Sequence, residues 1–337
     1  MIKKITAFFL ILISTYTGLL GQQRIINGLI SEGIKLHDKG NYIGAIDLYK
    51  KALLVNNIST QANYEIASTY LTIKDYKNAI KYSDNVIAAN VDYMDQAYIL
   101  KGAALDNLGK QLEAIKTYEQ GLKKFTKNYL LYYNLALTSF SLKDYKTADG
   151  SLEKALTLNP SHASSHFLLA LSMRTQGNRV KGILALYNFL LLEPNSKRTA
   201  SAVKTLEAAL KKSNEKISLA MPTKKENDEF YTAELMLALL ESSKANESNK
   251  TKSAAQLFSE NTNSFFEILG AIKKEKKDFW WSFYVDYFYT IASNNLTEAF
   301  CYYITQVNED VYKEWLKNNL QQLESFLAWQ TKYLHKF

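Results

Sequence analysis

The stretch from Leu130 to Pro160 reads LLYYNLALTSFSLKDYKTADGSLEKALTLNP, and segments with the same spacing of apolar and small residues recur on both sides of it. The repeated unit contains two apolar runs of helical period, separated by a short polar turn. A constant interval of this length indicates helix-turn-helix units that stack on one another, and so predicts an all-α solenoid. The small residues that set the interval, at steps of 34, 35, 34 and 34 residues, are Ala45, Ala79, Ala114, Ala148 and Gly182.

A second series of small residues lies on the first helix of each unit. Two helices approach to about 8 Å only where the contacting side chains are small, so we expect the two series to face each other. Large residues on the second helix should fill the space between units. The first-helix series is Gly33, Ala67, Gly102, Ala136 and Ala170, and the large residues include Tyr49, Tyr118, Leu152 and Leu186.

These positions resemble those of tetratricopeptide repeats, and the resemblance implies a right-handed α-solenoid. It covers five units in the segment 22–196. Only Pro160 and Pro194 match the proline that closes repeats of this family, while Phe189 and Val86 stand where the family prefers a small residue. We therefore expect some distortion at the ends of the stack. The expected units are about 26–59, 60–94, 95–128, 129–162 and 163–196.

In this family the first helix of each unit lines a concave face that binds protein segments. Carried onto this chain, the face is apolar and aromatic with few charges, and it includes Asn27, Ile30, Ile34 and Gln61. Some members clamp a C-terminal carboxylate with polar residues there, but Ile99 and similar residues replace most of that clamp. The resemblance implies that a partner peptide or helix is bound by Tyr64, Leu71, Ile99, Tyr133, Asn134, Leu137, Phe140, Phe167, Leu171 and Arg174.

An apolar groove of this kind needs a cover in water. Either a protein or peptide partner fills it, or the segment 222–337 packs on the solenoid. Charge favours the second alternative. The segment 222–337 carries 13 Lys against 16 Asp and Glu and is therefore net negative, whereas the whole chain has a net charge of +8, so the segment and the solenoid should attract each other.

The N-terminal segment 1–21 is typical of an export signal. Lys3 and Lys4 precede a short apolar run from Ile5 to Ile13, which is below the length of a membrane span. We expect cleavage before Gln22, with a retained anchor as the alternative. No cysteine lies nearby, so a lipoprotein is not expected. The mature protein should have no membrane span and should be periplasmic or extracellular in a bacterium.

After the repeats, 197–221 should form a capping helix and linker. Its Val203, Leu206 and Leu210 share one face, and Pro222 marks a boundary. Thr223 and Glu226 have the spacing of a capping box. The segment 222–337 should be a separate, aromatic-rich α-helical domain with helices near 225–244, 253–274, 278–293, 296–306 and 309–333, and with a loop at 245–251.

The segment 278–292, DFWWSFYVDYFYTIA, places aromatic residues on nearly every helical face. We interpret it as a central buried helix, and the alternative is an aromatic surface that binds a partner or a sugar. Its two apolar stripes are Trp280, Tyr284, Tyr287, Ile291 and Trp281, Val285, Phe288, Ala292.

Enzyme signatures are absent from the sequence: there is no HExxH, GxSxG, glycine-rich phosphate loop or paired-cysteine metal site. Cys301, the only cysteine, lies in an apolar segment and is expected to be a core residue. His162 and His166 share a helical face, but their repeat positions favour packing over metal binding. Scattered lysines and only four arginines argue against nucleic acid. We therefore predict a non-enzymatic scaffold or adaptor of the cell envelope without a cofactor; an enzyme or glycan-binding module in 222–337 is the alternative.

Overall fold

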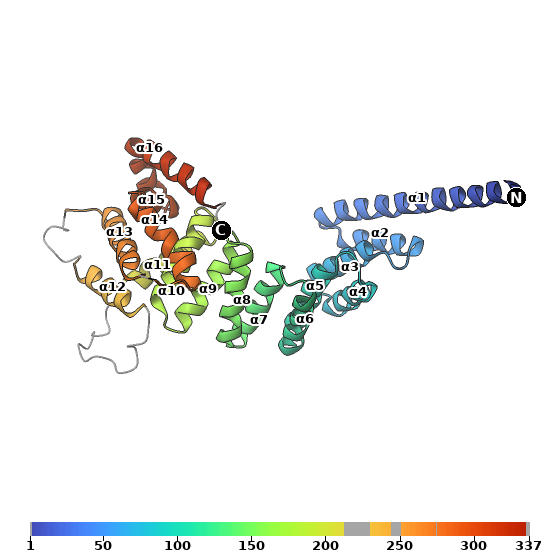
Figure 1. Cartoon of the computed structure of the whole chain (residues 1–337), viewed down its shortest axis with the longest axis horizontal. Coiled ribbons are helices and arrows are strands. Elements are labelled where there is room, and N and C mark those ends of the chain that lie inside the picture. Colours follow the sequence, from blue (N-terminus) through green and yellow to red (C-terminus); the bar gives the residue numbers. More distant parts are fainter. Residues whose placement is uncertain (1, 212–229, 244–250, 274, 335–337) are drawn as a thin grey trace. The chain divides into compact units, whose positions relative to one another are not determined.

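The computed structural model describes residues 2–211, 230–243, 251–273 and 275–334, and these residues contain helices and no strand (Figure 1). The all-α fold class is therefore confirmed. The first ten helices are α1 (Ile2–Asp38), α2 (Tyr42–Val55), α3 (Thr60–Thr72), α4 (Tyr76–Ala89), α5 (Met94–Asn107), α6 (Gln111–Lys124), α7 (Tyr129–Ser141), α8 (Tyr145–Leu158), α9 (Ala163–Thr175) and α10 (Arg179–Leu192). The others are α11 (Thr199–Lys211), α12 (Tyr231–Ser243), α13 (Ala254–Lys273), η2 (Trp280–Val285), α14 (Asp286–Ser293), α15 (Thr297–Ile304) and α16 (Glu309–Leu334).

The chain divides into two compact units, Met1–Ser151 and Leu152–Phe337. Each of the five expected repeats contains two helices, and the fifth pair, α9 and α10, belongs to the second unit together with the C-terminal helices. The expected boundary at Pro222, the capping box of Thr223 and Glu226, and most of the loop at 245–251 lie outside the described residues.

The hairpins of the first unit share one turn geometry. The second residue after the first helix has a left-handed backbone, with φ of 79° at Gly40 and 77° at Gly109. Lys74 and Lys143 occupy the same place with φ of 63° and 62°, a conformation that costs a side chain more than it costs glycine. In three of these hairpins the second helix (α2, α4 and α8) begins with a side-chain cap; for example, the Asn41 side chain accepts a hydrogen bond from the Gly44 amide (3.0 Å). Helix α6, preceded by Lys110, begins without one.

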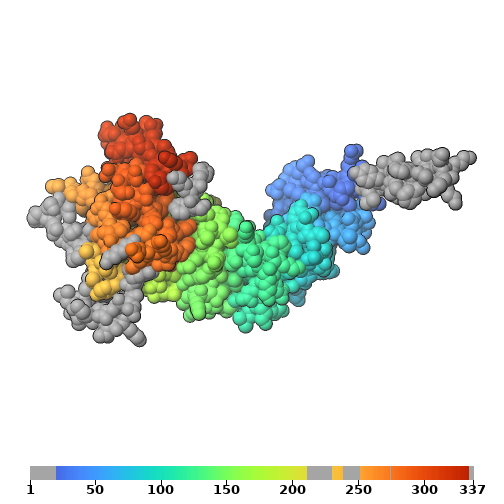
Figure 2. Space-filling model, viewed as in Figure 1, coloured from blue at the N-terminus to red at the C-terminus, as the bar shows by residue number. Residues whose placement is uncertain are grey.

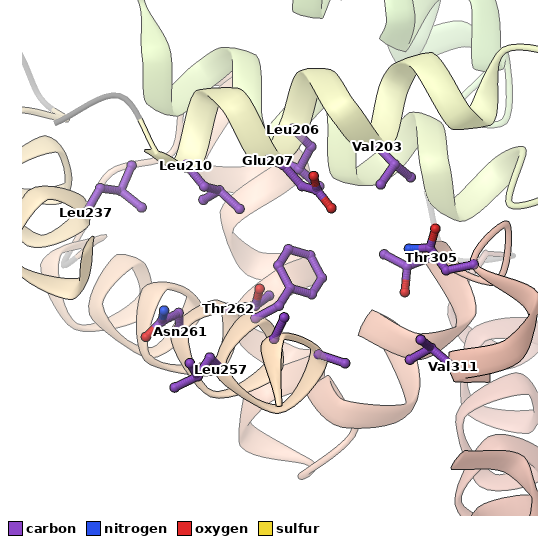
Figure 3. Close-up of a pocket in the computed structure, with 14 residues that line it drawn as sticks. Val203, Leu206, Glu207, Leu210, Leu237, Leu257, Asn261, Thr262, Thr305 and Val311 are labelled. Atoms are coloured by element: carbon purple, nitrogen blue, oxygen red, sulfur yellow. The ribbon is translucent and has the colours of Figure 1, made fainter. Parts of the chain in front are cut away.

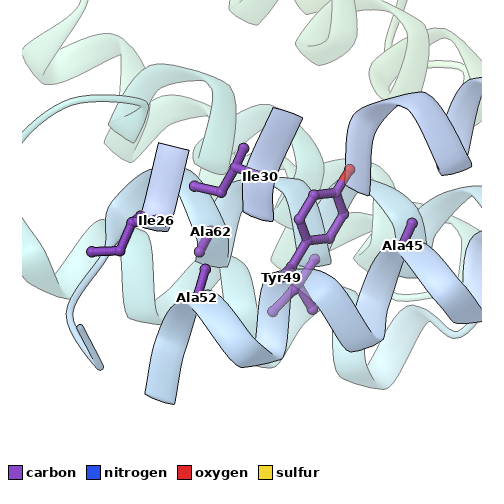
Figure 4. Packing of buried hydrophobic residues seen from close by; sticks show 7 residues of the cluster. Ile26, Ile30, Ala45, Tyr49, Ala52 and Ala62 are labelled. Atoms are coloured by element: carbon purple, nitrogen blue, oxygen red, sulfur yellow. The ribbon is translucent and has the colours of Figure 1, made fainter. Parts of the chain in front are cut away.

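The two series of small residues are buried, as the sequence predicted: Ala45, Ala79, Ala114 and Ala148 have no exposed surface. Tyr49 and Tyr118 cross the helix pair over Gly33 and Gly102. A Cβ atom added to Gly102 would lie 2.2 Å from Cε1 of Tyr118, and one added to Gly33 would lie 2.4 Å from Cε1 of Tyr49. Figure 4 shows the core around Tyr49, where Ile26, Ile30, Ala45, Ala52, Ala62 and Ile66 surround the ring.

In the second unit, helix α10 is surrounded by protein. Its residues from Gly182 to Leu191 are all buried, which is unusual for a helix at the end of a repeat stack. The Tyr187 ring lies 5.3 to 5.7 Å from the rings of Phe266, Phe288 and Phe300, and its hydroxyl bonds to Thr262 (2.9 Å). The C-terminal helices thus cover the fifth repeat within the second unit, which is coloured from green to red in the space-filling view (Figure 2).

Both aromatic stripes of 278–292 are buried. The interpretation as a central helix is therefore confirmed, although the helix begins with the π-helical turn η2 before α14 continues it. Trp281 stacks on Phe230 with parallel rings 4.4 Å apart. Asp286, the one charged residue of η2 and α14, pairs with Lys273.

Helix α1 includes the expected signal segment and the first helix of the first repeat in one continuous helix. Across the described parts of the chain, none of the helices is both long enough and apolar enough to cross a membrane.

Candidate functional site

The first unit carries the expected concave positions on helices α1, α3, α5 and α7. Most of these side chains are neither buried nor fully exposed: Tyr64, Leu71, Ile99, Tyr133, Asn134 and Phe140 are half-buried, and Leu137 is 40% exposed. They are therefore positioned by the hairpins while part of each side chain remains accessible. Apolar side chains in this state are suited to binding another apolar surface.

A groove of about 390 Å³ lies between α1 and α3. Four of the residues that line it, Asn27, Ile30, Ile34 and Gln61, are positions that the resemblance assigned to the concave face. Ser31 and Lys35 complete the lining, so the floor is aliphatic and the rim is polar. The groove is therefore a hollow in the described surface at positions that the resemblance assigned to the concave face.

Tyr93, which the sequence reasoning missed, extends this surface. Its ring stacks on Tyr64 with the ring centroids 5.1 Å apart, and Tyr93 itself has a left-handed backbone (φ 66°) just before α5. Burial raises the pKa of Tyr64, and the nearby carboxylate of Glu65 raises it further. Burial also raises the pKa of Glu65. The neighbourhood therefore favours neutral and apolar partner groups over acidic ones.

Asn134 is engaged by its own helix. Its side-chain amide donates to the carbonyl oxygen of Leu130 (2.7 Å). The same pattern ties Asn107 to Ala103 (2.8 Å). Asn134 is thus oriented along α7, and it lacks the basic companions that a carboxylate clamp requires.

The remaining three expected residues lie in the second unit, where the arrangement differs. Phe167 packs on Phe189 at 4.8 Å, and the guanidinium of Arg198 lies 5.6 Å from the Phe167 ring and 5.0 Å from the Phe189 ring. Arg198 also pairs with Glu193. Phe167 is therefore covered by the chain itself, while Leu171 is half-buried and Arg174 is exposed.

Arg198 was not identified from the sequence, although a signal was present. It lies 34 residues after Ser164, one repeat interval, and its Nη1 donates to the Ser164 hydroxyl (3.2 Å). The segment that leads into α11 therefore takes the place at which a sixth repeat would begin.

The two histidines that could have shared a metal are bound to other groups. His166 has no exposed surface; the Tyr284 hydroxyl lies 2.7 Å from its Nδ1 and the Pro160 carbonyl oxygen 2.8 Å from its Nε2. Because a carbonyl only accepts, Nε2 carries the proton and Nδ1 accepts from Tyr284. Burial lowers the pKa of His166 to about 4. His162 Nδ1 bonds to the hydroxyl of Ser165 (2.8 Å).

Cys301 is a buried free thiol, as expected for a core residue. Burial raises its pKa to about 12, so it is protonated at neutral pH. A nucleophilic cysteine needs the opposite shift. Among the described residues, no group of three or more histidine, cysteine, aspartate or glutamate side chains could hold a metal ion.

Comparisons with known proteins agree with this architecture. The tetratricopeptide-repeat family model matches residues 60–90, 95–123 and 129–162. The chain is 24% identical over 144 residues to a TPR repeat-containing protein of Methanocaldococcus jannaschii, a match that covers 43% of this chain and 25% of that protein. It is 31% identical over 156 residues to the human protein O-mannosyl-transferase TMTC3, covering 45% of this chain and 17% of that protein.

The match thus spans a quarter or less of the length of either relative. Among solved structures, YrrB, described as a TPR protein with an unusual peptide-binding site, is 16% identical with a TM-score of 0.42, covering 53% of this chain and 90% of that one. Tetratricopeptide repeats mediate protein–protein interaction, and the hairpins built by helices α3 to α8 are tetratricopeptide repeats.

Proposed function

We propose that this protein is a non-enzymatic adaptor that binds a helix or an extended peptide of a partner protein on the concave face of its first unit. The observation that carries the proposal is the groove between α1 and α3, because four of its six lining residues are concave-face positions of the repeat. The half-buried apolar residues of α3, α5 and α7 support it, since the hairpins hold them in place without covering them.

The chemistry of the face favours an apolar stripe on the partner. Ile99 and Leu137 are aliphatic, the rings of Tyr64, Tyr133 and Phe140 are aromatic, and such side chains contribute through burial of apolar area, at about 25 cal/mol per Å². An amphipathic helix, with apolar residues three and four apart, presents such a stripe.

The proposal includes a setting in the bacterial cell envelope. It rests on the basic start at Lys3 and Lys4 and the short apolar run from Ile5 to Ile13. N-terminal sequencing of the protein recovered from a bacterial host would test it. A mature protein that begins near Gln22 outside the cytoplasm supports the setting, and an uncleaved cytoplasmic protein contradicts it.

Site-specific photo-crosslinking tests the binding face. A photo-reactive phenylalanine analogue replaces Tyr133 or Ile99 in the full chain, and a matched chain carries it at Leu112, which is 70% exposed on the second helix of its repeat. We expect one partner band at both concave positions and none at Leu112. Equal crosslinking at all three positions would overturn the proposal.

Substitution provides the complementary measurement. Replacing Tyr133 and Phe140 by serine should abolish capture of that partner while the melting temperature stays close to that of Leu112→Ser. If the melting temperature falls steeply instead, the two side chains serve the core of the unit, and the face is not a binding surface.

A further inference from the structure

The second unit contains a cavity of about 370 Å³ beneath helix α11 (Figure 3). Helices α12 and α13 and the connection from α15 to α16 form its other walls. Its volume lies within the range of roughly 300 to 1,000 Å³ that is usual for small-molecule sites. The walls are mostly apolar, with Val203, Leu206, Leu210, Leu237, Ala254, Ala255, Leu257, Phe258 and Val311, and the polar lining residues are Glu207, Asn261, Thr262, Thr305 and Asn308.

The cavity explains what the apolar face of α11 does. The sequence places Val203, Leu206 and Leu210 on one face of this helix, as a cap for the repeats. In the structure that face looks across the cavity toward Leu257 and Val311 (Figure 3). Two apolar walls that face each other without touching are the arrangement of a binding site rather than of a close-packed core.

Of the lining residues that the structure describes, Glu207 is the only one with a charged side chain. It is half-buried, and within the described chain its carboxylate forms neither a hydrogen bond nor an ion pair. The nearby hydroxyl groups are already engaged: Thr262 bonds to Tyr187 (2.9 Å), and Thr305 donates to the carbonyl oxygen of Cys301 (2.7 Å). A cationic group on a ligand would stabilise the charged form of such a half-buried carboxylate by pairing with it.

From this combination we propose that the cavity binds a small molecule with an apolar body and one ammonium group, which pairs with Glu207. The apolar body lies between α11 and α13, and the amide of Asn261 offers a further hydrogen-bonding group. Among the described residues that line the cavity there is no lysine or arginine, so an anionic ligand of the same size meets only the carboxylate there. This site is separate from the proposed concave face, and the proposal does not depend on partner binding there.

Isothermal titration calorimetry of the full chain with octylammonium tests the proposal, with octanoate as the matched anion and ethanolammonium as a cation without the apolar body. We expect saturable binding of octylammonium only. Glu207→Gln should weaken it about tenfold or more, because a hydrogen bond to a charged group contributes about 1.5–3 kcal/mol. Glu324→Gln, at an exposed position on α16 outside the lining, should leave it unchanged.

A second variant separates binding from folding. Ala255→Phe fills the cavity from α13 and should abolish octylammonium binding while the circular dichroism spectrum and melting temperature of the free protein are kept. Three results would each refute the proposal: no saturable binding of octylammonium, equal affinity for octanoate, or full affinity in Glu207→Gln.

Discussion

Replacing Gly102 by alanine should destabilise the first unit, although alanine is the better helix former. The added Cβ would lie 2.2 Å from Cε1 of Tyr118, so the ring would have to retreat by about 1 Å to reach ordinary contact. The ring is 1% exposed and packs against Tyr98, Leu131 and Leu135, which leave it little room to move. Overpacking of this severity costs about 3 kcal/mol. The gain in helix propensity returns about 1 kcal/mol, so the expected net loss is about 2 kcal/mol.

Gly150→Ala is the matched control, because a Cβ there meets nothing within 4 Å and the residue is an exposed position of α8. It should stabilise the protein by about 1 kcal/mol. Equilibrium urea denaturation followed by circular dichroism compares the variants. Tyr118→Leu in the Gly102→Ala background should recover stability, because a leucine side chain is shorter than the tyrosine ring that the added Cβ would meet. If Gly102→Ala proves as stable as Gly150→Ala, the ring does not fix the distance between the helices.

Three further predictions concern single sites. Lys143→Gly should raise the free energy of unfolding, measured by urea denaturation, by up to about 1 kcal/mol, because Lys143 has a left-handed backbone (φ 62°) that glycine adopts more easily. Gly109→Lys should lower it for the same reason. Changes of the opposite sign would show that the left-handed backbone at these positions carries no strain. The pKa of His166 in the folded protein is lowered from 6.5 to about 4. The neutral side chain therefore contributes fully to the free energy of unfolding above pH 6.5, and this contribution is lost as the pH falls toward 4. This loss amounts to about 3 kcal/mol, and a pH series of unfolding free energies should show a shallower slope for His166→Gln. Tyr284→Phe removes the donor to His166 and should cost about 1–3 kcal/mol at pH 7, measured by the same denaturation; an unchanged midpoint would show that the hydrogen bond is not needed.

The helix hairpins were predictable because their determinants are local. The interval between Ala45 and its counterparts, the turn residues and the apolar period all lie within one repeat, and the structure buries these small residues as expected. The concave positions of the first unit follow from the same repeat positions, and their role in binding stays a prediction. Buried helix faces in the C-terminal segment followed from the density of aromatic residues around Trp281.

What the sequence left open depends on contacts between distant residues. Phe167 holds a concave-face position, yet Arg198 covers it, and no rule within one repeat predicts that cover. Helical period also suggested a plain α-helix at Trp280, whereas the aromatic packing is accommodated by a π-helical turn. The cavity beneath α11 arises only when helices from four separate segments meet.

The pairing of glycine with tyrosine in the first and third repeats also determines which hairpins can be exchanged. A first helix with alanine in place of Gly102 would collide with Tyr118, and one with alanine in place of Gly33 would collide with Tyr49. Recombination that joins half of one repeat to half of another would therefore be selected against, whereas duplication of whole hairpins would be tolerated.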